Sequence, residues 1–171
     1  MFTNWLRTNR FASVILALLR IYLGWGFLTA GWEKLTGETA FSAAGFIKKA
    51  ISSPVLASDK HHALYPTYTA FLKSFALPNI GLFNFLVPWG ELLVGLGLIL
   101  GTLTTAAVFF GMVMNFAYMF AGTVSSNPWN VMIGIFIIVA GYNAGKLGGD
   151  FWVVPWIREY TSKWFMKKET N

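Results

Sequence analysis

The sequence predicts an all-α integral membrane protein built around a bundle of four helices. Apolar residues make up 56% of its 171 residues and charged residues only 12%, whereas soluble domains contain roughly 25% charged residues. A soluble domain of this size cannot bury so much apolar surface. Because the apolar residues form four long segments, we interpret residues 1–171 as a single membrane domain.

Each of the four segments is predicted to form a transmembrane helix. At helical rise, a segment of about twenty residues covers about 30 Å, the thickness of the hydrocarbon core. The first segment contains one charge, Arg20, and the second contains one charge, Glu91. The third is uncharged, and the fourth is uncharged up to its last residue. The predicted spans are residues 11–31, 80–100, 105–122 and 129–146.

The segments between and after the spans also show helical patterns. The long loop of residues 32–79 contains apolar side chains at helical spacing in residues 65–75, which predicts an amphipathic helix. Residues 41–51 form a weaker helical candidate in the same loop. In the tail of residues 147–171, we predict a helix at the membrane interface whose apolar side is formed by Trp156, Ile157, Tyr160 and Trp164.

The distribution of Lys and Arg predicts the orientation in the membrane. With four spans, both ends of the chain lie on the same side, and basic residues concentrate on the cytoplasmic side of membrane proteins. We therefore expect a multi-pass membrane protein with both termini cytoplasmic and the loop of residues 32–79 outside. The net charge of +6 is explained by this topology and by anionic lipids, not by nucleic acid. The basic residues of the two ends are Arg7, Arg10, Lys146, Arg158, Lys163, Lys167 and Lys168.

Three polar residues are predicted to lie at one depth in the bundle. Arg20, Glu91 and Asn115 each stand nine or ten residues from the cytoplasmic end of their span, which is about 13–15 Å at helical rise. A lone charge at this depth costs roughly 2.5–3.5 kcal/mol, so we predict that Arg20 pairs with Glu91 and that Asn115 completes their hydrogen bonds. Two interpretations stay open: the layer holds the helices together, or it binds a headgroup or passes protons.

The residue types that are missing exclude several kinds of chemistry. Without cysteine, the chain alone forms no disulfide, thiolate metal site or iron–sulfur cluster. His61 and His62 lie in the loop outside the predicted spans, so haem ligation by two histidines within the bundle is excluded. We therefore predict no metal site and no haem.

Short motifs along the spans carry a family resemblance. One face of the first span presents Arg20, Gly24, Phe27, Gly31 and Lys34. The second span and the turn after it contain Glu91, Gly95, Gly97, Leu100, Gly101 and Thr104. With Asp150 after a glycine-rich exit from the last span, these features resemble the DoxX/DoxD-like family of small four-span bacterial membrane proteins. The resemblance covers most of residues 11–150.

This resemblance implies redox chemistry with a quinone as the acceptor. DoxD-type members are the large subunit of a thiosulfate:quinone oxidoreductase and act with a small DoxA partner subunit. On this basis the candidate catalytic residues are Arg20, Glu91 and Lys34, and Lys34 would attract an anionic donor such as thiosulfate at the outer mouth. The candidate quinone-binding residues are Trp25, Trp89, Asn115 and Tyr118.

Two other classes of function compete with this hypothesis. The first is a non-catalytic membrane scaffold that recruits soluble redox or stress-response proteins to its basic cytoplasmic face. The second is a small-molecule transporter that uses the mid-membrane charges as its substrate site; it ranks last, because the sequence has no inverted repeats. The expected partners are the lipid bilayer, a small partner subunit or a soluble oxidoreductase, and a second copy of the chain.

Overall fold

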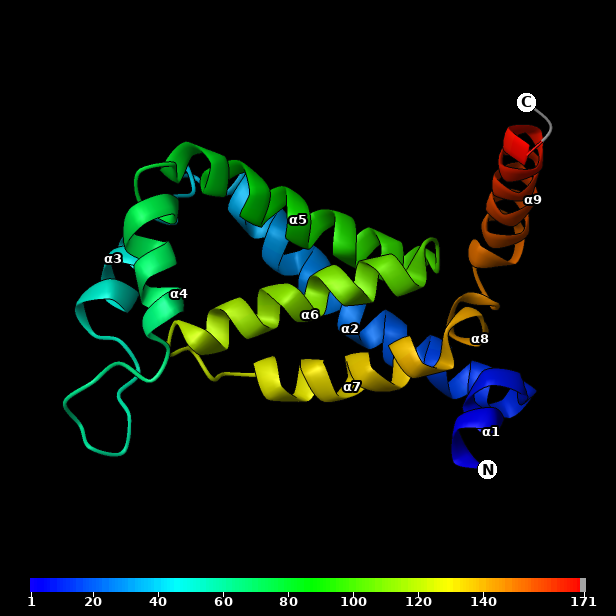
Figure 1. The fold of residues 1–171 in the computed structure, drawn as a ribbon, viewed down its shortest axis with the longest axis horizontal. Coiled ribbons are helices and arrows are strands. Elements are labelled where there is room, and N and C mark those ends of the chain that lie inside the picture. The colour runs from blue at the N-terminus through cyan, green and yellow to red at the C-terminus, as the bar shows by residue number, and fades with distance from the viewer. Residues whose placement is uncertain (170–171) are drawn as a thin grey trace.

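The computed structural model describes the backbone of residues 1–169 and the side chains of residues 1–163 (Figure 1). Within this range the chain is helical and has no β-strand, apart from an isolated bridge between Leu56 and Ala63. The predicted all-α class is therefore confirmed. The elements are α1 (Phe2–Thr8), α2 (Arg10–Thr36), α3 (Ala44–Ser52), α4 (Pro66–Phe71), the π-helical segment η1 (Leu72–Ala76), α5 (Ile80–Leu100), α6 (Thr104–Phe120), α7 (Asn127–Ala140), α8 (Tyr142–Gly145) and α9 (Asp150–Glu169).

The two longest apolar helices, α2 and α5, run antiparallel and form the most extensive helix pair (Figure 1). Glycines allow their backbones to approach: a Cβ at Gly24 would lie 2.9 Å from the Cβ of Leu98, and one at Gly31 would lie 2.8 Å from the carbonyl oxygen of Pro88. Both helices are long and apolar enough to cross a membrane. They match the first two predicted spans, although α2 continues past residue 31 to Thr36.

The helices α6 and α7 complete a ring with α2 and α5. Helix α5 packs against α6, α6 against α7, and α7 against α2. Both α6 and α7 are apolar but shorter than the first pair, with 17 and 14 residues. The predicted span of residues 129–146 is divided, because α7 ends before Gly141 and α8 follows. Gly141 has φ +58° and ψ −129°, a backbone conformation that glycine adopts more readily than other residues.

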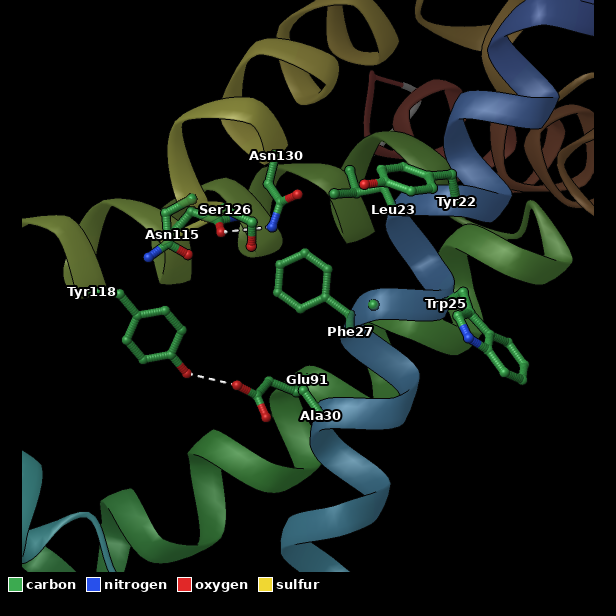
Figure 2. Close-up of a pocket in the computed structure, with 12 residues that line it drawn as sticks. Tyr22, Leu23, Trp25, Phe27, Ala30, Glu91, Asn115, Tyr118, Ser126 and Asn130 are labelled. Carbon is green, nitrogen blue, oxygen red and sulfur yellow. Dashed lines mark hydrogen bonds between the residues drawn. The ribbon is translucent and has the colours of Figure 1, made fainter. Parts of the chain in front are cut away.

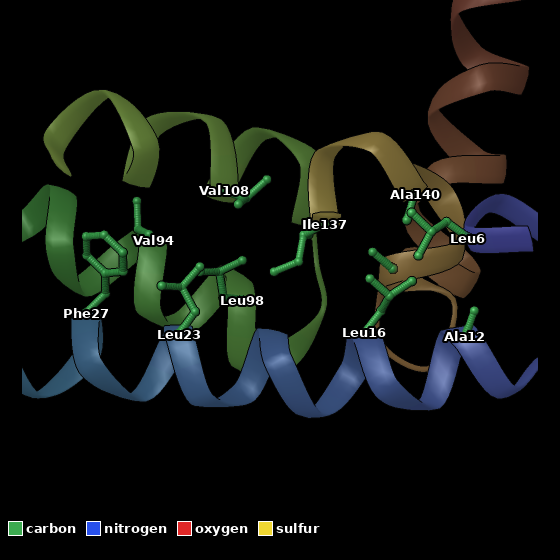
Figure 3. Close-up of a cluster of buried hydrophobic side chains, with 11 residues drawn as sticks. Leu6, Ala12, Leu16, Leu23, Phe27, Val94, Leu98, Val108, Ile137 and Ala140 are labelled. Carbon is green, nitrogen blue, oxygen red and sulfur yellow. The ribbon is translucent and has the colours of Figure 1, made fainter. Parts of the chain in front are cut away.

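Apolar side chains fill the interior of this ring and also cover its outside. The interior core is shown in Figure 3 and includes Leu16, Leu23, Phe27, Val94, Leu98, Val108 and Ile137. Large apolar side chains such as Leu93, Phe110 and Trp129 are more than half exposed on the outer surface. An outer surface this rich in apolar groups is suited to contact with lipid, not water.

The long loop folds into helices that cover one end of the ring. Its predicted helical segments are found as α3 and as α4 continued by η1. These helices share a second apolar core of Ala43, Ile47, Ala50, Leu72 and Ala76. The loop is attached to α6 through Tyr68, whose hydroxyl donates to the carbonyl oxygen of Ala117 at 2.9 Å. Burial raises the pKa of the Tyr68 hydroxyl above its usual value.

Both ends of the chain lie at the opposite end of the ring. The sequence pattern did not predict helix α1. The Asn143 side chain holds this helix in place, because its Nδ2 donates to the carbonyl oxygens of Leu6 at 2.8 Å and Asn9 at 3.0 Å. Helix α9 begins at Asp150, contacts α8 and points away from the four long helices (Figure 1). It includes the predicted interfacial helix, whose Trp164 side chain lies outside the described residues. Its place at a membrane interface stays a prediction.

Candidate functional site

Glu91 is the centre of a buried polar group formed by three helices. Its side chain projects from α5 and is only 4% exposed. One carboxylate oxygen, Oε2, forms an ion pair with the Nζ of Lys34 on α2 at 2.6 Å. The other, Oε1, accepts a hydrogen bond from the hydroxyl of Tyr118 on α6 at 2.8 Å (Figure 2). Lys34 also donates to the carbonyl oxygen of Ala30 at 3.1 Å, so each polar atom at the centre has a partner.

The predicted ion pair between Arg20 and Glu91 is wrong, because Glu91 pairs with Lys34. The contacts of the glycines set the register: Gly31 meets α5 near Pro88, and Gly24 meets it near Leu98. Glu91 therefore faces the C-terminal end of α2, whereas Arg20 faces the end of α5. The prediction placed both residues at one depth because it measured each from the end of its own segment. The continuation of α2 to Thr36 brings Lys34 to Glu91 instead.

Arg20 lies at the other end of the ring, in a tight junction of backbone segments. Its Nη2 donates to the carbonyl oxygen of Leu147 at 3.3 Å, and its guanidinium lies against Gly101 and Gly148. The side chain is 2% exposed. Its Nε and Nη1 have no hydrogen-bond partner among the described residues. The guanidinium is thus enclosed by the backbone of these segments.

Asp150 completes this junction by capping α6. Its carboxylate accepts hydrogen bonds from the backbone N–H groups of Leu103 at 2.6 Å and Thr104 at 3.0 Å. The first N–H groups of a helix lack partners within the helix, and a carboxylate there also interacts favourably with the helix dipole. Asp150 is 2% exposed and attracts the charge of Arg20. Asp150 thus ties the start of α9 to the start of α6, and Arg20 attaches α2 to the same junction through Leu147.

Two cavities lie on either side of the Glu91–Tyr118 hydrogen bond. The inner cavity, of about 300 Å³, lies between α2, α6 and α7 (Figure 2). The outer cavity, of about 310 Å³, lies between Lys34, the long loop and the segment before α7. Glu91, Tyr118 and Asn127 line both cavities. The hydrogen-bonded group is therefore the wall that divides them.

The inner cavity combines hydrogen-bonding groups with aromatic side chains. Asn115 donates to the carbonyl oxygen of Gly111 at 2.7 Å and accepts from the Nδ2 of Asn130 at 3.3 Å. Figure 2 shows the Phe27 ring between these amides and Glu91, with Trp25 on the far side of α2. The lining residues include Tyr22, Trp25, Phe27, Glu91, Asn115, Tyr118, Ser126, Asn127 and Asn130.

The structure brings together some of the predicted site residues and separates others. Glu91, Asn115 and Tyr118 line the inner cavity, and Trp25 contributes to its edge. Lys34 lines the outer cavity. Arg20 lies in the distant junction and lines neither cavity. Trp89 is 42% exposed and lies beside Phe85 on α5, and within the described structure it does not line either cavity.

Several residues that line the inner cavity were not among the predicted site residues: Tyr22, Leu23, Gly26, Phe27, Ala30, Ser126, Asn127 and Asn130. Ser126 and Asn127 belong to the end of the loop before α7 and to its first turn, where the sequence shows no periodic pattern, whereas Phe27 belongs to the stripe of α2 that the sequence does show. The pairing of Lys34 with Glu91 was also missed, although Lys34 shares the inward-facing stripe of Gly24, Phe27 and Gly31 on α2. That stripe is the signal from which the pair could have been found.

Breaking the ion pair at Lys34 should destabilise the protein. We expect Lys34→Met to lower the free energy of unfolding by about 1–3 kcal/mol, less than for a fully buried pair, because the Lys34 side chain is 27% exposed. Lys34→Met combined with Glu91→Gln should recover most of this loss, since no unpaired charge is left. Thermal unfolding in mild detergent measures both. A double variant no more stable than the single one would show that the ion pair is not the cause.

Comparison with known proteins identifies the family. The family model for DoxX matches residues 15–123, a region that contains Lys34, Glu91 and Tyr118. Neither a curated protein nor a solved structure gave a significant match to the chain. DoxX proteins are membrane proteins that are often linked to oxidoreductase functions. The two long apolar helices and the match over most of the chain lead to one conclusion: this protein belongs to the DoxX family of membrane proteins.

Proposed function

We propose that this protein is the quinone-binding membrane subunit of an oxidoreductase. The observation that carries the proposal is the inner cavity, in which a buried carboxylate, a tyrosine hydroxyl and amide groups face aromatic side chains. Ligand sites are mostly apolar cavities of roughly 300–1,000 Å³ with a few polar groups that orient the ligand. A quinone ring has the same two properties, a flat apolar body and polar oxygens at its ends.

The residues of the cavity fit such a ring by their chemistry. Asn130 and Asn115 offer amide groups, and Tyr118 and Glu91 offer groups that hold or release a proton. Phe27 and Trp25 supply aromatic surface. When bound, a quinone supplies the capacity to accept two electrons together with two protons. Because the chain has no cysteine, electrons come from a donor such as thiosulfate directly or through a partner subunit.

The proposal includes the topology of the protein. The helices α2, α5, α6 and α7 cross the bilayer as a four-helix bundle, with both termini on the cytoplasmic side and the loop of residues 32–79 outside. Two observations support it: the ring of contacts among these helices and the apolar side chains that cover its outer surface. The exposed side chains of Tyr22 and Trp25 at the edge of the inner cavity then face lipid, from which a quinone enters.

Filling the inner cavity should remove bound quinone. Gly26 lines this cavity, and a Cβ at this position would meet no atom within 4 Å. Gly26→Trp is therefore expected to occupy the cavity without disturbing the helix packing. We expect the quinone retained by the purified protein, measured by mass spectrometry of organic extracts, to fall at least tenfold.

The matched control is Gly81→Trp, at an exposed glycine of α5 where a Cβ also meets no atom within 4 Å. It should retain quinone at the wild-type level. Equal retention by both variants, or no quinone above the background of the lipid extract in the wild type, would argue against the proposal.

A second candidate function is a scaffold for soluble partners, and helix α9 favours it. This helix carries exposed Trp152, Trp156 and Tyr160 together with exposed Arg158 and Lys163, and it packs on the short α8. If α9 recruits partners, Arg158→Ala with Lys163→Ala should reduce the recovery of co-purified proteins at unchanged quinone content. Recovery that is indifferent to these charges would count against the scaffold.

A further inference from the structure

The geometry points to a proton path: we propose that Tyr118 and Glu91 carry protons between the inner and the outer cavity. A ligand in the inner cavity would then exchange its protons through the outer cavity beside Lys34. This inference rests on the proposed function, because it requires a ligand with an ionisable hydroxyl group in the inner cavity. It adds the route that the protons take and the residues that move them.

The first argument is the position of the carboxylate. Its two oxygens have different partners: Oε1 accepts from Tyr118 at 2.8 Å, and Oε2 meets the Nζ of Lys34 at 2.6 Å. Tyr118 and Glu91 line both cavities, whereas Lys34 lines only the outer one within the described structure. A proton that reaches Tyr118 from the inner side can therefore pass along this hydrogen bond to Glu91, whose other oxygen meets Lys34 at the outer cavity.

The second argument is the irregular backbone beside the carboxylate. The segment between α6 and α7 is non-helical, and its residues 122–126 are exposed. Thr123 and Ser125 of this segment line the outer cavity together with Lys34. Backbone N–H and C=O groups that have no helical partner form hydrogen bonds with water where they are exposed. We therefore interpret the outer cavity as hydrated.

The third argument is the local charge. Lys34 is the cation that α2 contributes, and Tyr118 is the ionisable group that α6 contributes. The segment before α7 and its first turn contribute neutral side chains, Thr123, Ser125 and Asn127. Arg20 and Asp150 lie in the junction at the far end of α2. Lys34 is therefore the cation that is paired with Glu91 at the outer cavity.

The transfer involves only protons. The hydroxyl of Tyr118 gives its proton to Oε1 of Glu91 and takes the proton of the ligand hydroxyl, which becomes an anion. Glu91 then releases its proton to water in the outer cavity and returns to the carboxylate paired with Lys34. The reverse sequence protonates the ligand. General acid–base groups placed in this way contribute typically 10²–10⁴-fold to the rate of proton transfer.

The experiment uses a coloured acid as the probe, 2-hydroxy-1,4-naphthoquinone, bound to the full chain in nanodiscs. Its absorbance changes when its hydroxyl ionises, so the rate of proton exchange follows from a rapid pH jump. Compared at probe concentrations that saturate each variant, we expect Tyr118→Phe and Glu91→Gln to slow this response by about 10²-fold. Tyr68→Phe is the matched control, since it removes a partly buried tyrosine hydroxyl that lines neither the inner nor the outer cavity, and it should respond like the wild type.

Rescue separates proton transfer from a structural role. Imidazole added to Glu91→Gln should accelerate the response, because a small buffer can replace the carboxylate through the outer cavity, and it should leave the wild type unchanged. Variants that bind the probe and respond at the wild-type rate would overturn the proton path and leave the proposed function standing. A wild-type protein that does not bind the probe would instead overturn the proposed function and the path together.

Discussion

Replacing Gly95 by leucine is expected to separate α2 from α5 and to abolish the folded state in detergent. A Cβ at Gly95 would lie 2.6 Å from the Cα of Leu28 and would overlap its backbone nitrogen. Backbone atoms cannot rotate away as a side chain does, so the helices must move apart. Overpacking in a core typically lowers the free energy of unfolding by about 1–3 kcal/mol. A clash with backbone atoms lies at the upper end of this range or beyond it, so we expect the free energy of unfolding to fall by more than about 3 kcal/mol.

The control for this prediction is Gly26→Ala on α2. A Cβ there meets no atom within 4 Å, and alanine is favoured over glycine within a helix by roughly 0.5–1 kcal/mol. This variant should be as stable as the wild type or more so. Thermal unfolding followed by size-exclusion chromatography measures both variants. A Gly95→Leu protein that elutes and melts like the wild type would show that the close approach of these helices is not required.

The second large effect is expected for Asp150→Ala, at the junction of α2, α6 and α9. This change removes the acceptor of two backbone N–H groups, those of Leu103 and Thr104. It also leaves the buried guanidinium of Arg20 without its acidic neighbour. A buried N–H group left without an acceptor costs about 1–3 kcal/mol, so with two such groups we expect the free energy of unfolding to fall by roughly 3–5 kcal/mol.

Asp59→Ala provides the comparison, because Asp59 is an exposed aspartate of the long loop. Its pKa is lowered by hydrogen bonds from the backbone N–H of His61 and from His62, but these contacts are local. Exposed substitutions of this kind usually change stability by less than about 0.5 kcal/mol. Equal melting temperatures for the two variants would contradict the structural role of Asp150. Quinone retention should be unaffected in any Asp150→Ala protein that remains folded, since Asp150 lies outside the lining of the inner cavity.

Much of the fold follows from the sequence pattern. The all-α class, the spans that became α2 and α5, and the helices of the long loop match the structure within a few residues. Local signals explain this success, because apolar length and helical spacing depend on neighbours in the chain. The division of the last segment into α7 and α8 was not predicted. The segment stays apolar through Gly141, but the backbone of Gly141 is not helical.

The candidate site was predicted less well, for a reason that Arg20 illustrates. The sequence identifies Arg20, Lys34 and Glu91 as polar residues within or beside apolar helices, but it offers two cations for one carboxylate. Choosing between them requires the register of α2 against α5. The contacts of Gly24, Gly31 and Gly95 determine that register, and they become known only when both helices are packed.

The sequence by itself therefore determined that this is an all-helical protein with apolar helices suited to a membrane, and which polar side chains those helices carry. The tertiary structure alone decided that Lys34 pairs with Glu91 and that Arg20 joins Asp150 at the far end. It alone also placed Tyr118 and Glu91 between two cavities. The physical reason is that helix formation depends on contacts within a few residues, whereas ion pairs and cavities depend on how distant helices slide and pack against one another.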